Sequence, residues 1–235
     1  MTHRGPDLPY SLVAGVVPFR RAWLVAGAKM HAATFACETP KIFATFDDVL
    51  AEKPAYSTVV VHAPIGYRDR IGDPLRACDR EARLLLKSRR VAVSPAPTYE
   101  TLRGDDDGRL ARLDAVGVMM LPYHREIFAL MSPFRQRTVY SGNPELSFYR
   151  LNGDSPLRFS KNREDGRLER RAVLEKRVQS LHNVLKAEAD GIPLKHLLDA
   201  AALLWTARLV FSHGARRLPA DGEWDSEGLR TEFVF

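Results

Sequence analysis

The sequence predicts an α/β protein whose sheet begins with antiparallel strands, and two observations indicate this class. Strand-like apolar segments come first and helical segments fill most of the second half of the chain, an order that does not fit a uniform βαβ series. In addition, residues 58–63 are a valine-rich run that ends in a Pro-Gly loop. Such a run is typical of a buried central strand, and α/β sheets place their functional groups at the carboxyl ends of such strands.

The expected strands are short apolar runs bounded by polar or turn-forming residues. Residues 11–17 and 22–28 flank Pro18-Phe19-Arg20-Arg21, a spacing that suits a hairpin. The remaining strands are expected at residues 32–37, 58–63 and 137–141, and at 231–235 as a final edge strand. We expect residues 1–10 to be a loose leader and residues 11–235 to form a single domain.

Helices are expected where apolar residues recur with helical spacing. Thr45 is placed to cap a short helix over 47–53, and Pro74 lies in the first turn of a helix over 74–88. The other expected helices are residues 106–131, broken near Gly117 and Pro122, and residues 145–150, 164–188 and 193–213. A Pro-rich loop over 91–104 is either a lid or a simple connection.

Composition narrows the class of protein. Of the 235 residues 45% are hydrophobic, and 35 Lys and Arg against 29 Asp and Glu give a formal charge of +6. This balance favours acidic partners such as nucleic acid, although many basic proteins merely have a solvated basic surface. Cys37 and Cys78 form no CxxC pair, no apolar run is long enough to span a membrane, and the N-terminus has no apolar signal segment. We therefore expect a cytoplasmic protein without a membrane partner.

A basic stripe is the first candidate for function. Its residues recur at intervals of four, three, four and three and are Arg76, Arg80, Arg83, Lys87 and Arg90. On one helix this spacing places them along one face. Guanidinium groups suit a phosphate backbone because each offers a planar fork of donors. The stripe thus indicates a nucleic-acid-binding surface, and the alternative is a solvated face that is partly balanced by pairs such as Asp79 with Arg83.

Two acids are the second candidate. Glu145 follows the end of an expected strand, and Asp199 lies within the apolar helix over 193–213. Carboxylates that converge from a strand end and a helix suit Mg²⁺ or Mn²⁺, hard cations that favour oxygen ligands. The alternatives are structural: Asp199 pairs with Lys195, Arg208 or Arg230, and Glu145 stabilises the N-terminus of its helix by about 0.3–1 kcal/mol.

His62 is the third candidate, because it stands where the central strand meets its loop. It is either a catalytic group or a structural histidine. The sequence contains no GxGxxG, P-loop, GxSxG or HExxH motif, and its histidines show no metal-ligand spacing with one another or with cysteine.

Four groups of residues occur in a characteristic order. They are Ala63-Pro64-Ile65-Gly66 after the valine strand; residues 76–83 leading to Val93-Ser94-Pro95-Ala96-Pro97; Asn143-Pro144-Glu145-Leu146-Ser147-Phe148 before Leu151-Asn152-Gly153; and Lys161 with residues 166–170, Leu198-Asp199-Ala200-Ala201-Ala202 and residues 205–208. In order and spacing they resemble the widespread, largely uncharacterised family of predicted nucleases with an RNase H-like fold, over about residues 12–235.

The resemblance implies a mixed five-stranded sheet flanked by helices, and divalent-metal hydrolysis of phosphodiesters by clustered carboxylates. At positions where that family usually carries acids, this chain has Val17, His62, Lys195 and His196. The usual acids that remain are Glu145 and Asp199. A divalent pair in a confined site needs more negative charge than two carboxylates supply.

We therefore expect a degenerate, non-catalytic relative of this family that binds nucleic acid through the basic helix face. One alternative is a Mg²⁺- or Mn²⁺-dependent phosphodiesterase that uses Glu145 and Asp199 as metal ligands, with His62 beside them. The other alternative is a scaffold or protein-interaction role.

Overall fold

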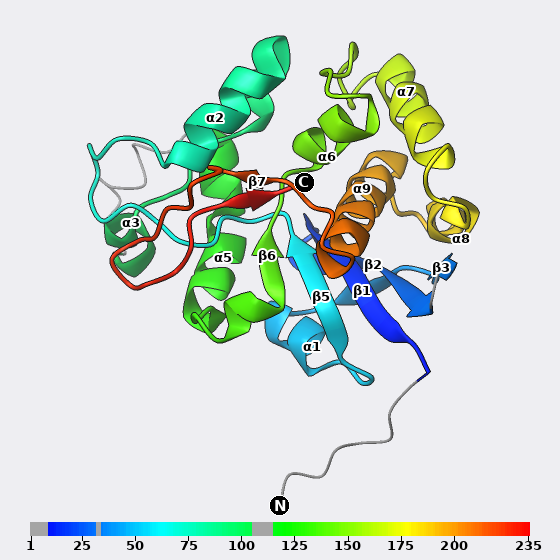
Figure 1. Cartoon of the computed structure of the whole chain (residues 1–235), viewed down its shortest axis with the longest axis horizontal. Coiled ribbons are helices and arrows are strands. Elements are labelled where there is room, and N and C mark those ends of the chain that lie inside the picture. The colour runs from blue at the N-terminus through cyan, green and yellow to red at the C-terminus, as the bar shows by residue number, and fades with distance from the viewer. Residues whose placement is uncertain (1–8, 32–33, 105–114) are drawn as a thin grey trace, which may run out of the picture.

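A mixed sheet of six strands is the centre of the computed structural model, which describes residues 9–31, 34–104 and 115–235 (Figure 1). The sheet order is β3-β2-β1-β5-β6, and β4 also pairs with β2. The strands are β1 (Ser11–Phe19), β2 (Ala22–His31), β3 (Thr34–Cys37), β4 (Lys41–Phe43), β5 (Tyr56–Val61) and β6 (Val139–Ser141). The pairings of β2 with β1, β3 and β4 are antiparallel, whereas β1, β5 and β6 run parallel. The predicted class and the antiparallel start are confirmed, and β4 adds one strand to the five expected.

The predicted hairpin between β1 and β2 is present and tight. Phe19 pairs with Ala22, so only Arg20 and Arg21 form the turn, and their φ angles are 47° and 61°. Two consecutive positive φ angles give a turn whose twist matches that of the flanking strands.

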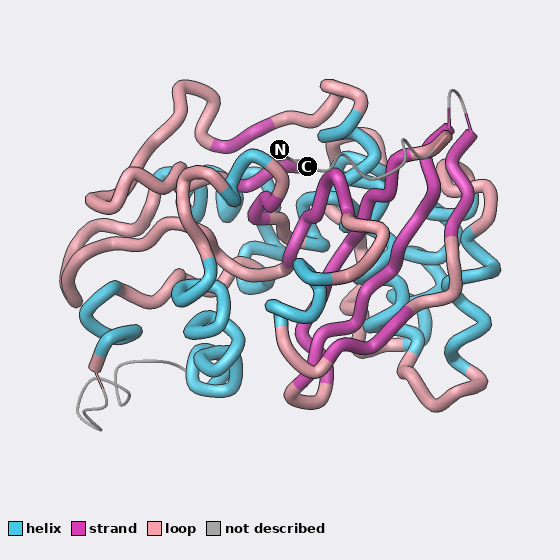
Figure 2. The backbone as a smooth tube through the Cα atoms, turned by 90° about the horizontal axis from the view of Figure 1, so that it is seen from below, coloured by secondary structure: helices cyan, strands magenta, loops and turns pink. Residues whose placement is uncertain are grey.

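Helices cover both faces of the sheet (Figure 2). On one face α9 (Leu194–Phe211) packs on β1, β2 and β5, with α6 (Pro144–Leu151), α7 (Glu164–Glu175) and α8 (Leu181–Leu185) beside it. On the other face lie α1 (Phe46–Ala51), which Thr45 caps as predicted, and α5 (Ala115–Leu130). None of the helices in the described ranges is long and apolar enough to cross a membrane.

The alternation of side chains along β1 explains how one strand serves both layers. Val13 and Val17 belong to the core under α9, and Ala14 and Val16 belong to the core under α1 and α5. Gly15 lies on the α9 side, where an added Cβ would stand 2.1 Å from the backbone nitrogen of Leu204. The absence of a side chain there lets the helix backbone pack directly on the strand.

Two predicted helices differ from the structure. The long charged helix over 164–188 is wrong: α7 ends at Glu175, and α8 and a 3₁₀ turn, η3 (Lys186–Glu188), follow separately. Val178 and Leu181 are buried in the core, and the chain turns after α7 to bury them. The break expected near Gly117 and Pro122 is also wrong, because α5 continues through both. Burial of its Tyr123 and Ile127 against the sheet offsets the backbone hydrogen bond lost at the proline. Residues 106–114 of that prediction lie outside the described residues.

The remaining segments lie near the carboxyl ends of β5 and β6. α2 (Ala77–Leu86) is shorter than the helix predicted over 74–88, and a 3₁₀ helix, η1 (Lys87–Ala92), continues from it. The Pro-rich segment after η1 contains a short helix, α3 (Tyr99–Arg103), which the sequence did not indicate. The predicted last strand is present as β8 (Phe233–Val234), but it pairs with β7 (Arg217–Leu218) in a separate sheet. Most of the leader expected at residues 1–10 lies outside the described residues.

Candidate functional site

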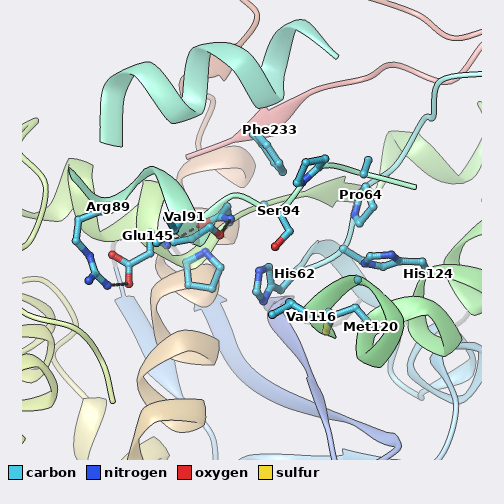
Figure 3. Close-up of a pocket in the computed structure, with 18 of the residues that line it drawn as sticks. His62, Pro64, Arg89, Val91, Ser94, Val116, Met120, His124, Glu145 and Phe233 are labelled. Carbon is cyan, nitrogen blue, oxygen red and sulfur yellow. Dashed lines mark hydrogen bonds and ion pairs between the residues drawn. The ribbon is translucent and has the colours of Figure 1, made fainter. Parts of the chain in front are cut away.

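A cavity of about 370 Å³ lies at the carboxyl ends of β5 and β6 (Figure 3). His62 directly follows β5, and residues 142–145 directly follow β6, and both segments line the cavity. Their mutual position is fixed by two hydrogen bonds: the Ser141 hydroxyl donates to the Ala63 carbonyl at 2.8 Å, and the Gly142 N–H donates to the Val61 carbonyl at 2.9 Å. This is the edge of the sheet at which α/β proteins bind ligands.

The Pro-rich segment, whose role the sequence left open, covers this cavity. Residues 91–92 at the end of η1 and residues 94–97 line it. The segment is held at its start, because the Asn143 amide donates to the Ala92 carbonyl at 3.0 Å and the Arg83 guanidinium donates to the Val93 carbonyl at 2.8 Å. Opposite to it, the α5 residues Val116, Met120 and His124 form another wall.

Glu145 is a buried carboxylate that two guanidinium groups already neutralise. It lies in the first turn of α6, where its backbone N–H donates to the capping side chain of Asn143 at 2.9 Å. One carboxylate oxygen accepts from the fully buried Arg170 and, at 3.3 Å, from Arg89. The guanidinium of Arg170 also donates to the carbonyls of Phe159 and Gly166, which holds it in place.

Asp199 is also buried and also paired. The Lys161 ammonium lies 2.5 Å from its Oδ2, and Oδ1 has no hydrogen-bond partner among the described residues. The sequence suggested Lys195, Arg208 or Arg230 as the pairing residue, but the partner in the structure is Lys161. Lys161 lines the cavity, whereas Asp199 stands behind it.

The two acids do not form a donor set that fits a pair of divalent ions. Oxygens of Glu145 and Asp199 accept hydrogen bonds from Arg and Lys side chains, whose charge repels a metal ion. In the parts of the chain that the structure describes, no group of three or more His, Cys, Asp or Glu could hold a metal.

His62, Ser94 and His124 gather at one end of the cavity, and Arg89 and Glu145 lie at the other (Figure 3). Burial lowers the pKa of His62 to about 3, and the charges of Lys161 and His196 act in the same direction. Burial likewise lowers the pKa of His124 to about 3. Both imidazoles are therefore neutral at pH 7. Nδ1 of His124 is buried and has no partner among the described residues. The sequence did not single out His124, since it lies in an apolar helix without any motif.

The basic stripe is divided between the interior and the surface. The prediction that Arg76 lies on the exposed face of the helix is wrong. Only 3% of Arg76 is exposed, and α2 begins one residue after it. Its guanidinium forms two hydrogen bonds to Asp79, at 2.9 and 2.7 Å, and donates to the Gly66 carbonyl at 2.9 Å. Asp79 therefore pairs with Arg76 and not with Arg83, which is half-buried. The stripe residues that remain exposed are Arg80, Lys87 and Arg90.

A protein family described as "Protein of unknown function (DUF429)" matches residues 15–223. The match covers most of the chain and includes α9, nearly all of the cavity lining and the six-stranded sheet except residues 11–14 of β1. No curated protein and no solved structure matches the chain.

Proposed function

Because the chain belongs to the DUF429 family, whose function is unknown, we propose a function from the site itself. We propose a non-catalytic relative of RNase H-like nucleases that binds nucleic acid through the exposed basic side of α2 and η1. The proposal rests on the difference between the acids, which are paired and buried, and the exposed basic residues, which remain available to a ligand. The two remaining acids are held by cationic side chains, while Arg80, Lys87 and Arg90 stay exposed.

The sheet supports the part of the proposal that concerns the fold. An RNase H-like fold implies a mixed sheet with antiparallel first strands, parallel later strands and helices on both faces. The order β3-β2-β1-β5-β6, with β1, β5 and β6 parallel, agrees with that arrangement.

The exposed cations suit a phosphate backbone in spacing as well as in charge. Lys87 and Arg90 are both exposed and are three residues apart in η1. Arg80 is exposed one turn and a half before the end of α2. Binding of this kind is electrostatic and independent of base sequence, so its affinity falls steeply as salt rises.

A binding titration tests the proposal. Labelled single-stranded and duplex oligonucleotides are titrated with the protein at several salt concentrations, and anisotropy is read. Reversing the three charges (Arg80→Glu, Lys87→Glu, Arg90→Glu) should lower affinity, and should reduce the slope of log K against log salt by about 2–3, since each lost phosphate contact removes about 0.7–0.9. A matched control reverses three exposed cations elsewhere, namely Arg163, Lys176 and Arg177. Equal effects of both triple variants would contradict a dedicated surface.

The same samples, incubated with Mg²⁺ or Mn²⁺ and run on a gel, test the non-catalytic part. We expect retention without cleavage. Metal-dependent cleavage that disappears in a Glu145→Gln, Asp199→Asn variant would overturn this part and favour a phosphodiesterase. Neither retention nor cleavage would favour a scaffold role.

A further inference from the structure

The cavity at the ends of β5 and β6 has the composition of a small-molecule site. Its volume of about 370 Å³ lies within the range of about 300–1,000 Å³ that is usual for ligand pockets. Most of its walls are apolar, and the prolines and Phe233 among them are rigid or flat. The apolar lining residues include Val91, Pro95, Pro97, Val116, Met120 and Phe233. Such walls pack well against a planar apolar ring.

Among the described residues, the cations that line the cavity and the ionic groups paired with them add up to a single positive charge. Arg76, Arg89 and Lys161 line it, and each is paired with a carboxylate, of Asp79, Glu145 and Asp199 respectively. Arg170 is a second cation on Glu145, so four cations face three carboxylates. One negative charge on a ligand balances this set, whereas a doubly charged phosphate exceeds it.

Arg89 is the cation that can bind such a charge without leaving an acid unpaired. Arg170 holds Glu145 independently, and Arg89 contacts the same oxygen only at 3.3 Å. Arg89 lines the cavity, and 17% of its side chain is exposed. A carboxylate on a ligand would form a charge-assisted hydrogen bond with this guanidinium.

The opposite end of the cavity offers neutral hydrogen-bonding groups. Figure 3 shows Ser94, His62 and His124 there, apart from Arg89 and Glu145. All three line the cavity, and 8% of His124 is exposed. Hydroxyl and imidazole groups form hydrogen bonds with a hydroxyl, so a ligand hydroxyl at this end would be favoured.

We propose that the cavity binds a small aromatic acid, with one carboxylate at Arg89, a planar ring between the apolar walls, and a hydroxyl group at His124. This inference is independent of the nucleic-acid surface on α2 and η1, because it uses none of the exposed stripe residues.

Calorimetric titration of the full chain tests the proposal with four probes. They are 4-hydroxyphenylacetate; phenylacetate, which lacks the hydroxyl; 4-hydroxybenzyl alcohol, which lacks the charge; and uridylyl-uridine, a dinucleotide with one phosphodiester charge. We expect 4-hydroxyphenylacetate to bind most tightly. Loss of the carboxylate should weaken binding at least tenfold, and loss of the hydroxyl should weaken it severalfold.

Three variants connect the binding to this cavity. Arg89→Met should weaken 4-hydroxyphenylacetate at least tenfold, and Arg90→Met, the neighbouring exposed cation, is the matched control that should leave it unchanged. Val116→Trp starts from a side chain that is 48% exposed at the cavity wall, so the variant can fold while its ring fills the space. His124→Phe should remove the preference for the hydroxylated probe over phenylacetate.

The outcomes are distinguishable from those of the nucleic-acid proposal. Binding of the acid without binding of oligonucleotides would support this inference and refute the other proposal. Tighter binding of the dinucleotide than of the acid, with both lost in Val116→Trp, would overturn the inference and assign the cavity to a nucleic-acid strand. Binding that Arg89→Met and Val116→Trp do not affect would overturn it as well, as would no binding of any probe at millimolar concentration.

Discussion

Replacing Arg76 by methionine should destabilise the protein strongly and leave nucleic-acid binding unchanged. The Arg76 and Asp79 side chains are 2% and 0% exposed, so the variant leaves a buried carboxylate without its cation. Breaking a buried pair by removing one partner costs about 3–5 kcal/mol. The Gly66 carbonyl also loses its hydrogen bond. In a chain of 235 residues, 1 kcal/mol corresponds to about 2–4 °C, so Tm should fall by roughly 6–20 °C.

Urea unfolding followed by circular dichroism measures this loss, and two companion variants interpret it. Arg76→Met with Asp79→Leu removes both charges and should recover most of the stability, because apolar replacements of a buried pair are often neutral. Arg80→Met alters an exposed cation, so it should leave stability unchanged and reduce the salt slope of oligonucleotide binding by about one unit. A loss below about 1 kcal/mol for Arg76→Met, or a salt slope reduced as in Arg80→Met, would refute the structural role of Arg76.

Two further predictions concern the cavity and the sheet. Burial lowers the pKa of His62 and of His124 to about 3, so between pH 3 and 6.5 the unfolded state binds more protons than the folded state. The free energy of unfolding should therefore fall as the pH drops below about 6.5, by up to about 1.4 kcal/mol per pH unit for each histidine. Urea unfolding at pH 7.5 and pH 5.0 measures this, and an unchanged slope in His124→Phe would contradict it. Gly15→Ala should lower the free energy of unfolding by at least about 1–3 kcal/mol, because the added Cβ would meet the backbone of α9. Thermal melting measures this loss. The control is Gly214→Ala, in which the nearest atom to the added Cβ would be 3.8 Å away.

Local patterns predicted those parts of the fold that depend on neighbouring residues. The capping box at Thr45 is complete within three residues, and the Phe19–Ala22 hairpin is closed by its own turn. His62 and Glu145 could be assigned to one edge of the sheet because parallel strands end together. The end of α7 at Glu175 could not be predicted, since the chain turns there to bury Val178 and the sequence carries no helix-breaking residue at that point.

Partners that are distant in sequence explain most of what the sequence missed in the site. Asp199 pairs with Lys161, 38 residues earlier, and Glu145 with Arg170, 25 residues later. Helical spacing assigned Arg76 to a surface face on the assumption that the helix had already begun. The helix begins one residue later, and the Gly66 carbonyl attracts the guanidinium inward. Such pairings depend on the tertiary fold, and a single sequence contains no periodicity that reports them.

The packing of α9 on β1 sets the order in which the protein can be completed during synthesis. The Val13 and Val17 side of the first hairpin leaves the ribosome early, but α9, which covers it, begins only at residue 194. At a synthesis rate of about 5–20 residues per second, roughly 9–35 s pass before α9 is synthesised and can pack on this face. During that interval the nascent chain exposes an apolar strand surface, which makes it a substrate for chaperones. Chains that stop before α9 should consequently accumulate in the insoluble fraction of expressing cells.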